Sequence, residues 1–533
     1  MHSDIDYIIH YHERTKHHLD AYAKGPASLD WDDQPNPFRR FTGTETIRLP
    51  KPGGEIDCLF TDLDTPGVIV PRPLDLNALG LLLELSFGLS AWKQFGPDRW
   101  ALRCNPSSGN LHPTEAYVIC NTSDLLEPGV YHYASHDHQL ERRCRFKTND
   151  PEPALFVGLS SIYWREAWKY GERAFRYCQH DIGHALAALS YAAACLGWTV
   201  ELCSEASDED LRNWLGLNRP EDFMAQEPEA PDCLCRIHVD KSQTQSPFDE
   251  GLLSLNFQDS DWYGRAEKLS QHHFYQWPII EEVAAHCSKP ATEKERWLAP
   301  LCELPAPAHN IKASRLIRQR RSAQRFNGKA ELLPLQAFHR IMLALLPNAK
   351  PPFTAWNWLP QTHIVLFVHR VIGLEPGLYI LLRDENDKAE LQQAFSDEFV
   401  WERAAENYAL YRLSQGNARQ AAKTLSCHQT IASDSFFSLG MLVRFAANIE
   451  AAPWRYRRLF WECGLLGQIL YLEAEAAGYR GSGIGCFFDD AMHGLLGLQN
   501  AAWQSLYHFT VGEPLEDERL QTLPAYSHLA FSP

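Results

Sequence analysis

The chain carries one short sequence twice, and this repetition limits the folds that it can adopt. Residues 126–131 read Leu-Glu-Pro-Gly-Val-Tyr, and residues 374–379, which follow 248 positions later (374 − 126), read Leu-Glu-Pro-Gly-Leu-Tyr. An apolar run typical of a strand precedes both copies. A second match aligns residues 183–217 with residues 464–498, 281 positions apart (464 − 183), and keeps its glycines in register. Two matches in the same order predict one structural unit that is used twice.

The two copies differ in length between these matches. The offset grows by 33 residues (281 − 248), which places an insertion in the second copy between about Gln393 and Ser438. A proline-rich stretch from Cys287 to Asn310 is the expected linker. We therefore predict two domains, residues 1–285 and residues 300–533.

Each copy combines a strand with an Ala- and Leu-rich helix that is apolar on nearly every face and is therefore expected to be buried. These helices run through Gly183 and Gly464, and Gly197 and Gly478 lie where a left-handed C-terminal cap is expected. The expected class is α+β, with the unit duplicated in one chain as an intramolecular pseudo-dimer. A site between the two halves is then free to become asymmetric.

The composition excludes several classes of partner. The 50 Lys and Arg against 67 Asp and Glu give a formal charge of −17, which argues against a nucleic-acid-binding protein. The 14 cysteines contain no C-x-x-C motif, and the longest apolar stretch, residues 185–198, falls short of the roughly 20 residues that a membrane span needs. We expect a reduced, cytoplasmic protein without a membrane partner.

Three polar or glycine-rich segments point to chemistry. Residues 317–326 place four arginines within eight residues, and guanidinium groups bind phosphate bidentately, although a solvated helix end is the commoner fate of such a run. Residues 481–486, Gly-Ser-Gly-Ile-Gly-Cys, let the backbone approach a planar ligand, but Cys486 stands where a dinucleotide fingerprint has its third glycine. Residues 105–113 form a polar loop that by itself is an ordinary turn.

Together these segments resemble the nitroreductase family, and more closely its SagB-type (thiazole/oxazole dehydrogenase-like) branch. Residues 11–17, Tyr-His-Glu-Arg-Thr-Lys-His, and residues 168–173, Trp-Lys-Tyr-Gly-Glu-Arg, are similar to that branch in particular. The resemblance spans about Tyr11 to Tyr526. It implies a mainly antiparallel sheet wrapped by helices, paired as a dimer with FMN at the interface, so that each FMN draws on both partners.

The resemblance also implies which residues hold FMN. The phosphate end and the flavin rim correspond to Arg320, Arg321 and Ser322, with Gln324 where the family more often has a cation near the pyrimidine. The segment beside the flavin edge corresponds to Gly483, Ile484, Gly485 and Cys486, and the loop lent by the other half to Pro106, Ser107, Ser108 and Asn110. Arg519, seven residues after Gly512, is a candidate tail cation on the phosphate.

The alignment predicts that the second site is lost. Thr61-Asp62-Leu63 stands opposite the arginine segment, and a carboxylate repels an anion. Residues 202–205 replace the glycines with larger side chains and an acid, and residues 354–358 replace the polar loop with two tryptophans. We therefore expect one FMN per chain.

The catalytic candidates are Lys169 and Tyr170, which match a Lys-Tyr pair implicated in proton handling in the SagB-type branch. The pair suits general acid–base chemistry, but an amphipathic helix end with Lys169 in solvent explains the same residues. Cys486 is expected to be a small packing residue and not a redox thiol. His180 and His184 share a helix face, and with no third ligand motif no metal is expected.

The resemblance thus implies an FMN-dependent oxidoreductase. The leading expectation is a SagB-type dehydrogenase that converts an azoline to an azole in a small molecule or peptide, with NAD(P)H or oxygen as redox partner. Two alternatives stay open: an NAD(P)H-dependent nitro or quinone reductase, and a non-catalytic flavin-binding scaffold protein.

Overall fold

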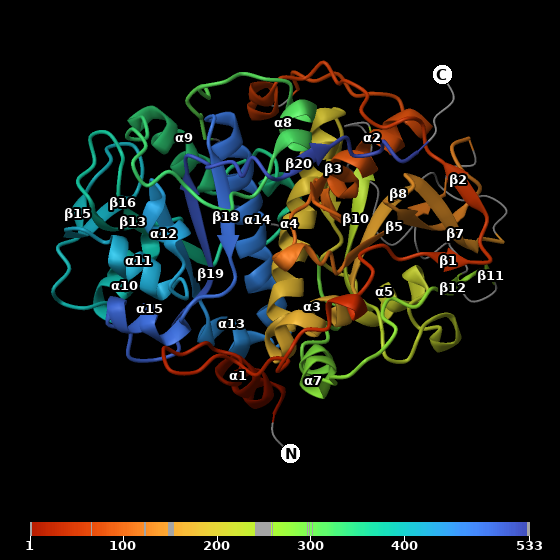
Figure 1. Cartoon of the computed structure of the whole chain (residues 1–533), viewed down its shortest axis with the longest axis horizontal. Helices are drawn as coiled ribbons and strands as arrows, with labels where there is room; N and C mark the ends of the chain where they lie inside the picture. The colour runs from red at the N-terminus through yellow and green to blue at the C-terminus, as the bar shows by residue number, and fades with distance from the viewer. Residues whose placement is uncertain are drawn as a thin grey trace.

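Two antiparallel sheets lie on either side of two long, buried helices, which run side by side through the centre of the molecule (Figure 1). The structure is a computed structural model that describes residues 3–529, apart from residues 66, 122–123, 148–153, 240–256, 258–259, 296, 298 and 301. The last three of these fall within the expected linker.

The first sheet has the strand order β11-β7-β6-β5-β8-β10-β9, with β2 also paired to β7. Its strands are β2 (Thr46–Arg48), β5 (Thr114–Cys120), β6 (Gly129–Ala134), β7 (Gln139–Arg145), β8 (Leu155–Ser161), β9 (Thr199–Leu202), β10 (Ala230–His238) and β11 (Asp261–Trp262).

The second sheet has the order β15-β16-β14-β13-β17-β19-β18. Its strands are β13 (Thr362–Val368), β14 (Gly377–Leu381), β15 (Glu402–Arg403), β16 (Leu410–Gln415), β17 (Phe437–Arg444), β18 (Arg480–Ile484) and β19 (Trp503–Gly512). Two small sheets add β1 (Phe41–Thr42) with β12 (Arg265–Ala266), and β3 (Leu89–Phe95) with β4 (Asp98–Arg103) and the late strand β20 (Gln521–Leu523).

The helices of the first half and the segment after it are α1 (Asp4–Arg14), α2 (Leu76–Phe87), α3 (Tyr163–Tyr170), α4 (Ala174–Cys195), α5 (Asp208–Leu215) and α7 (Pro278–His286). Those of the second half are α8 (Ala313–Gln319), α9 (Leu335–Leu345), α10 (Lys388–Ala394), α11 (Arg419–Leu425), α12 (Thr430–Asp434), α13 (Ala446–Ala451), α14 (Arg455–Ala476) and α15 (Asp489–Leu496). No described helix has the length and apolar character that a membrane crossing requires.

The structure confirms the duplication and its register. Both ends of α14 lie 281 positions after those of α4 (455 − 174 and 476 − 195), and β13 begins and ends 248 positions after β5 (362 − 114 and 368 − 120). In both copies of the repeated motif the tyrosine hydroxyl donates to the carbonyl four residues earlier, from Tyr131 to Glu127 and from Tyr379 to Glu375. Helices α11 and α12 lie within the predicted insertion.

The two central helices touch at their glycines. A Cβ on Gly183 would lie 2.1 Å from the carbonyl oxygen of Trp461, and a Cβ on Gly464 would lie 2.1 Å from that of His180. The contact is reciprocal, because each residue lies 281 positions from its counterpart in the other helix. Only residues without a side chain allow the helices to approach this closely.

Two buried ion pairs repeat the same reciprocity across the contact between the halves. Arg176 donates to Asp489 at 2.8 Å, and Arg457, 281 positions after Arg176, donates to Asp208 at 2.8 Å. Although burial opposes the charged form, Arg173 and Arg176 hold the pKa of Asp489 below its usual range. Removing one partner of such a pair costs about 3–5 kcal/mol, so the pairs fix how the halves meet.

The proposed domain boundaries at residues 285 and 300 stay a prediction. The ends of α1 and α7 nevertheless have matching surroundings: the backbone N–H of His17 donates to Asp489 at 2.9 Å, and that of Lys289 donates to Asp208 at 3.1 Å. The chain that follows α7 therefore lies against the first half as the chain that follows α1 lies against the second.

The glycine contact predicts an unusual response to alanine. In an ordinary helix Gly→Ala stabilises by about 0.5–1 kcal/mol, but at Gly464 the new Cβ meets backbone, and overpacking of this kind costs about 1–3 kcal/mol. We expect Gly464→Ala to lower the midpoint of thermal unfolding. The control is Gly494→Ala in α15, where a Cβ meets nothing within 4 Å; a raised midpoint in both variants would contradict the helix crossing.

Candidate active site

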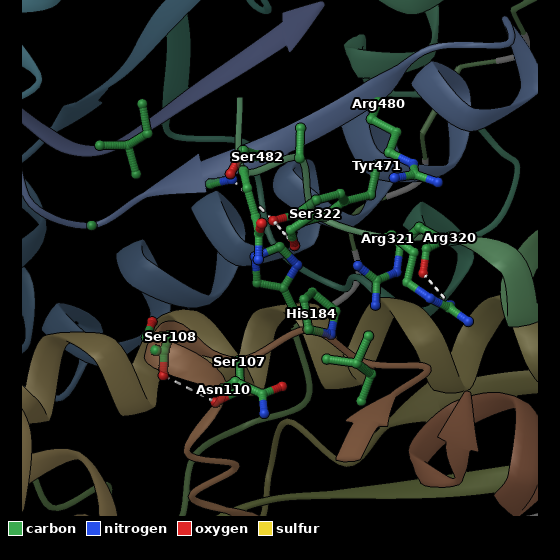
Figure 2. A pocket seen from close by; sticks show the side chains of 18 of the residues that line it. Ser107, Ser108, Asn110, His184, Arg320, Arg321, Ser322, Tyr471, Arg480 and Ser482 are labelled. Atoms are coloured by element: carbon green, nitrogen blue, oxygen red, sulfur yellow. Dashed lines mark hydrogen bonds between the residues drawn. The ribbon is translucent and has the colours of Figure 1, made fainter. Parts of the chain in front are cut away.

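A cavity of about 490 Å³ opens between the two halves, within the size range of ligand pockets. One wall is the loop at residues 105–112 of the first half, and the opposite wall combines residues 320–324 with residues 480–486 of the second half. Figure 2 shows Ser107, Ser108 and Asn110 facing Ser322 and Ser482 across the space.

One end of the cavity is cationic, with Arg320, Arg321 and Arg480 in its lining (Figure 2). Lys93 also lines the cavity, and Arg480 forms an ion pair with Glu516. Arg320 is 3% exposed and donates to the carbonyl of Arg103 at 3.0 Å, while its Nε has no hydrogen-bond partner among the described residues. Burial, and then repulsion from Arg320, lower the pKa of Arg321 to about 10. An anion at this end would relieve both penalties.

The glycines of β18 and the residues after it pack against tyrosines. A Cβ on Gly483 would lie 2.0 Å from the hydroxyl of Tyr507, and one on Gly485 would lie 2.3 Å from the ring of Tyr177. The sequence expectation that these glycines make room for a ligand is thus incomplete, because they also let the chain lie directly on two buried rings. Tyr471 links the wall together, accepting from Gly483 N at 3.0 Å and from Ser322 Oγ at 2.9 Å.

The opposite loop has an unusual backbone that other contacts hold in place. Gly109, Asn110 and His112 have φ values of 60°, 60° and 54°, in the left-handed region. A Cβ on Gly109 would lie 2.4 Å from the hydroxyl of Tyr170, so glycine is required there for space as well as for conformation. The backbone N–H of Ser108 donates to Asp181 at 3.1 Å, which ties the loop to α4.

Most of the residues expected from the sequence line this one cavity, namely Pro106, Ser107, Ser108, Asn110, Tyr170, Arg320, Arg321, Ser322, Gln324, Gly483, Ile484, Gly485 and Cys486. Lys169 and Arg519 are not in its lining. The side chain of Arg519 is 72% exposed and pairs with Asp517 at 2.7 Å, so the structure gives no contact for the proposed phosphate role.

The cavity is also lined by Lys93, Asp181, Tyr471 and Arg480, none of which was predicted from the sequence, and by His184, for which no ligand role was predicted. Arg480 directly precedes the glycine-rich segment at residues 481–486. Its position in the sequence could therefore have identified it as a cavity residue. Asp181, His184 and Tyr471 lie on buried faces of helices, and Lys93 lies on a strand that is distant in the sequence. No sequence motif identifies these positions.

Two buried carboxyl groups lie behind the polar loop. Burial raises the pKa of Asp181 to about 7 and raises the pKa of Glu166 well above its usual range. Ser107 Oγ lies 3.4 Å from Glu166, and Ser108 contacts Asp181. His184 stays neutral, because burial lowers its pKa to about 3. The cavity therefore adjoins a pair of carboxyls that can hold a proton near neutral pH.

The corresponding place in the other half of the pseudo-dimer is filled. Trp356 and Trp358 are buried there with ring centroids 4.9 Å apart, and Asn357 donates to the carbonyl of Leu202 at 2.8 Å. Thr292, which follows α7, lies across this position. Its N–H donates to the carbonyl of Glu205 at 3.0 Å, and its Oγ1 donates to the carbonyl of Ser204 at 3.1 Å. Among the described residues, a smaller cavity of about 120 Å³, lined by Asp62, Leu63 and Thr354, is left there, against about 490 Å³ around Arg320.

Comparison with known proteins agrees with this arrangement. Residues 317–513 match the nitroreductase family. A protein of Methanocaldococcus jannaschii that is provisionally named a nitroreductase is 28% identical in an alignment of 158 residues that covers 27% of this chain and 76% of that protein. A crystal structure from Anabaena variabilis, also provisionally named a nitroreductase, covers 96% of this chain and 100% of its own with a TM-score of 0.70 at 22% identity.

The chain has the nitroreductase fold. The agreement with the Anabaena variabilis structure extends over both halves, whereas the family match lies in the second half alone. A chain of the Escherichia coli microcin synthetase McbBCD complex is 17% identical over 36% of this chain and 77% of its own, and its TM-score of 0.26 supports no inference.

FMN, which the nitroreductase resemblance implies, fits the residues present. The cationic end offers a guanidinium Nε without a partner among the described residues, which suits a phosphate. The volume and the mixture of glycine, serine and tyrosine walls suit a planar polar ring system.

The cationic end predicts a loss of FMN affinity when its arginines are removed. A charge-assisted hydrogen bond contributes about 1.5–3 kcal/mol, so Arg320→Ala with Arg321→Ala should weaken FMN binding by roughly 100-fold or more in a fluorescence titration. Arg519→Ala is the matched control and should bind FMN as the unaltered chain does. Equal affinity in all three proteins would mean that the arginine run is only structural.

The filled second place predicts the flavin stoichiometry. Flavin released by denaturation should amount to about one FMN per chain. The measurement is the absorbance of the released flavin against the protein concentration from amino-acid analysis. Two tightly held flavins per chain would contradict our assignment of Trp356 and Trp358 as cavity-filling residues.

Proposed function

We propose that this chain is an FMN-dependent oxidoreductase that holds one flavin between its two halves. The observation that supports this most strongly is a single cavity that connects a buried arginine end with the polar loop of the opposite half. Arg320 and Arg321 would hold the phosphate, and Ser322 with the backbone of residues 483–486 would orient the ring. Bound there, FMN would supply an acceptor for two electrons, as flavins do in oxidoreductases.

We further propose that the reaction is a SagB-type dehydrogenation, in which an azoline ring of a small molecule or peptide becomes an azole. The residues at 11–17 and 168–173, which resemble that branch, support this choice. At an offset of 281 the second half has Glu450-Ala451 in place of Lys169-Tyr170. The pair therefore occurs only in the half that lends the polar loop, as expected for a single asymmetric site.

Such a reaction removes a proton as well as a hydride, and the groups around the loop suit the proton. Tyr170 lines the cavity, and burial raises the pKa of its hydroxyl, so it stays protonated and can donate. The Nζ of Lys169 lies 5.4 Å from the centre of the Tyr170 ring, and 3.2 Å from where a Cβ on Gly109 would be. Asp181, whose pKa lies near neutrality, is a second group that can take up or release the proton.

The reaction class can be tested directly. The flavin-loaded chain is mixed without oxygen with thiazoline- and oxazoline-containing peptides, and the flavin absorbance and the product mass are followed. We expect bleaching of the flavin together with loss of two hydrogen atoms from the ring. Bleaching by NADPH alone, with reduction of nitro or quinone compounds and no azole formed, would favour the reductase instead.

The proton-handling role predicts a specific pattern among variants. Lys169→Ala should slow azole formation by about 10²–10⁴-fold, the usual range for a general acid or base, and FMN content should be unchanged. Tyr170→Phe keeps the ring and removes only the hydroxyl, so it should slow the reaction without unfolding the site. Lys51→Ala, an exposed lysine outside the cavity, is the control. Normal turnover in Lys169→Ala with full flavin would exclude a role for this amine.

A further inference from the structure

The insertion of the second half brings a second cysteine, Cys427, next to Cys486 of the cavity wall. Cys427 lies between α11 and α12, and its Sγ is 2.7 Å from the Sγ of Cys486. The loop is anchored beside the cavity, since Gln429 donates to the carbonyl of Cys486 at 3.2 Å and the N–H of Phe488 donates to Leu425 at 2.8 Å. Cys427 and His428 have φ values of 50° and 58°, so this loop is held in a left-handed conformation that non-glycine residues rarely adopt.

The separation of the two sulfurs suits reversible bond formation. A disulfide has its sulfurs about 2.05 Å apart, so the two side chains need to move by less than about 1 Å to form one. Both thiols are partly exposed, whereas Cys58, Cys195, Cys233 and Cys235 are buried. A small reagent can therefore reach this pair from outside, and Cys486 itself lines the cavity.

The surroundings divide the two sulfurs into a nucleophile and a proton donor. The hydrogen bond with Cys427 lowers the pKa of Cys486 against the effect of burial, and His17 and Arg173 lower it further. The same contact raises the pKa of Cys427. The Nδ1 of His17 accepts from the N–H of Ala23 at 2.9 Å, so the proton of the neutral ring is on Nε2. A stabilised thiolate beside a protonated thiol is the arrangement that reactive dithiols use.

We propose that Cys427 and Cys486 are a redox-active pair that exchanges two electrons with the flavin of this site. The electron transfer rests on the proposed function, whereas formation of the disulfide does not. In the dehydrogenation direction, the S–S bond breaks as it takes two electrons and two protons from reduced flavin, which returns to its oxidised form. A small disulfide compound then restores the S–S bond by thiol–disulfide exchange and leaves as two thiols.

The first experiment tests the pair without relying on flavin. The full chain is equilibrated with mixtures of reduced and oxidised dithiothreitol, quenched in acid, alkylated with N-ethylmaleimide and analysed by peptide mass spectrometry. We expect Cys427 and Cys486 to lose their labels together and to appear as one cross-linked peptide. Cys302→Ser, which removes another partly exposed thiol, should behave as the unaltered chain does. Two independently labelled thiols across the whole range would overturn the proposal.

The second experiment tests the link to flavin. The FMN-loaded chain, first oxidised by the disulfide reagent, is titrated with dithionite without oxygen. The unaltered chain should consume four electrons per flavin, and Cys427→Ser should consume two, a twofold difference with no substrate present. Cys427 is the residue to change because it does not line the cavity. Consumption of two electrons by both proteins, with the disulfide still intact, would overturn the exchange.

These outcomes separate the two hypotheses. If the chain binds no FMN, the proposed function fails, but the alkylation experiment still reports whether the dithiol exists. If FMN binds and azole forms while the cysteines never pair, the proposed function stands and the redox pair is excluded.

Discussion

The contact of two helix backbones at Gly183 and Gly464 governs the rest of this structure. Because neither residue has a side chain, α4 and α14 approach until each helix touches a carbonyl of the other. Arginines on these helices then reach across to Asp489 and Asp208, and the two halves are held in one relative orientation. A cavity whose walls come from different halves requires such a fixed orientation, since neither wall forms a complete site.

The duplicated fold forms two equivalent positions between the halves, one around Arg320 and one around Trp356, and their side chains differ greatly. Around Arg320 a loop of small polar residues, Ser107 to Asn110, borders a cavity, whereas around Trp356 two indoles and the chain after α7 take up most of the space. Packing in the shared core is nearly symmetric, so it does not explain the difference. The difference arises from a few residues on loops, where substitutions have little effect on the stability of the fold.

Much of the fold could be predicted, because matching segments recur in the sequence at fixed offsets. The ends of helices could be predicted from capping residues and glycines. The two walls of the cavity could be predicted as segments, since Arg320 and Ser107 lie in compositionally unusual stretches. Asp181 could not, because its chemistry comes from burial beneath a loop that is distant in sequence. The course of the chain after β19 could not be predicted either, because no residue in this segment indicates that β20 pairs with β3. As a result the position of Arg519, which is exposed, was not predicted correctly. Cys427 lies in the insertion, which has no counterpart in the first half. Its place beside Cys486 could therefore not be predicted by comparing the two halves.

The covalent connection between the halves changes how such a site behaves in a population of molecules. In a dimer of separate chains, the quantity of complete sites falls on dilution, and every substitution appears on both sides of the interface. Here the two halves belong to one chain, so dilution does not alter the local concentration at which they meet. Each inherited change also affects one side alone, so an acid such as Asp62 can stand in one half while the other half keeps Arg320 and Arg321.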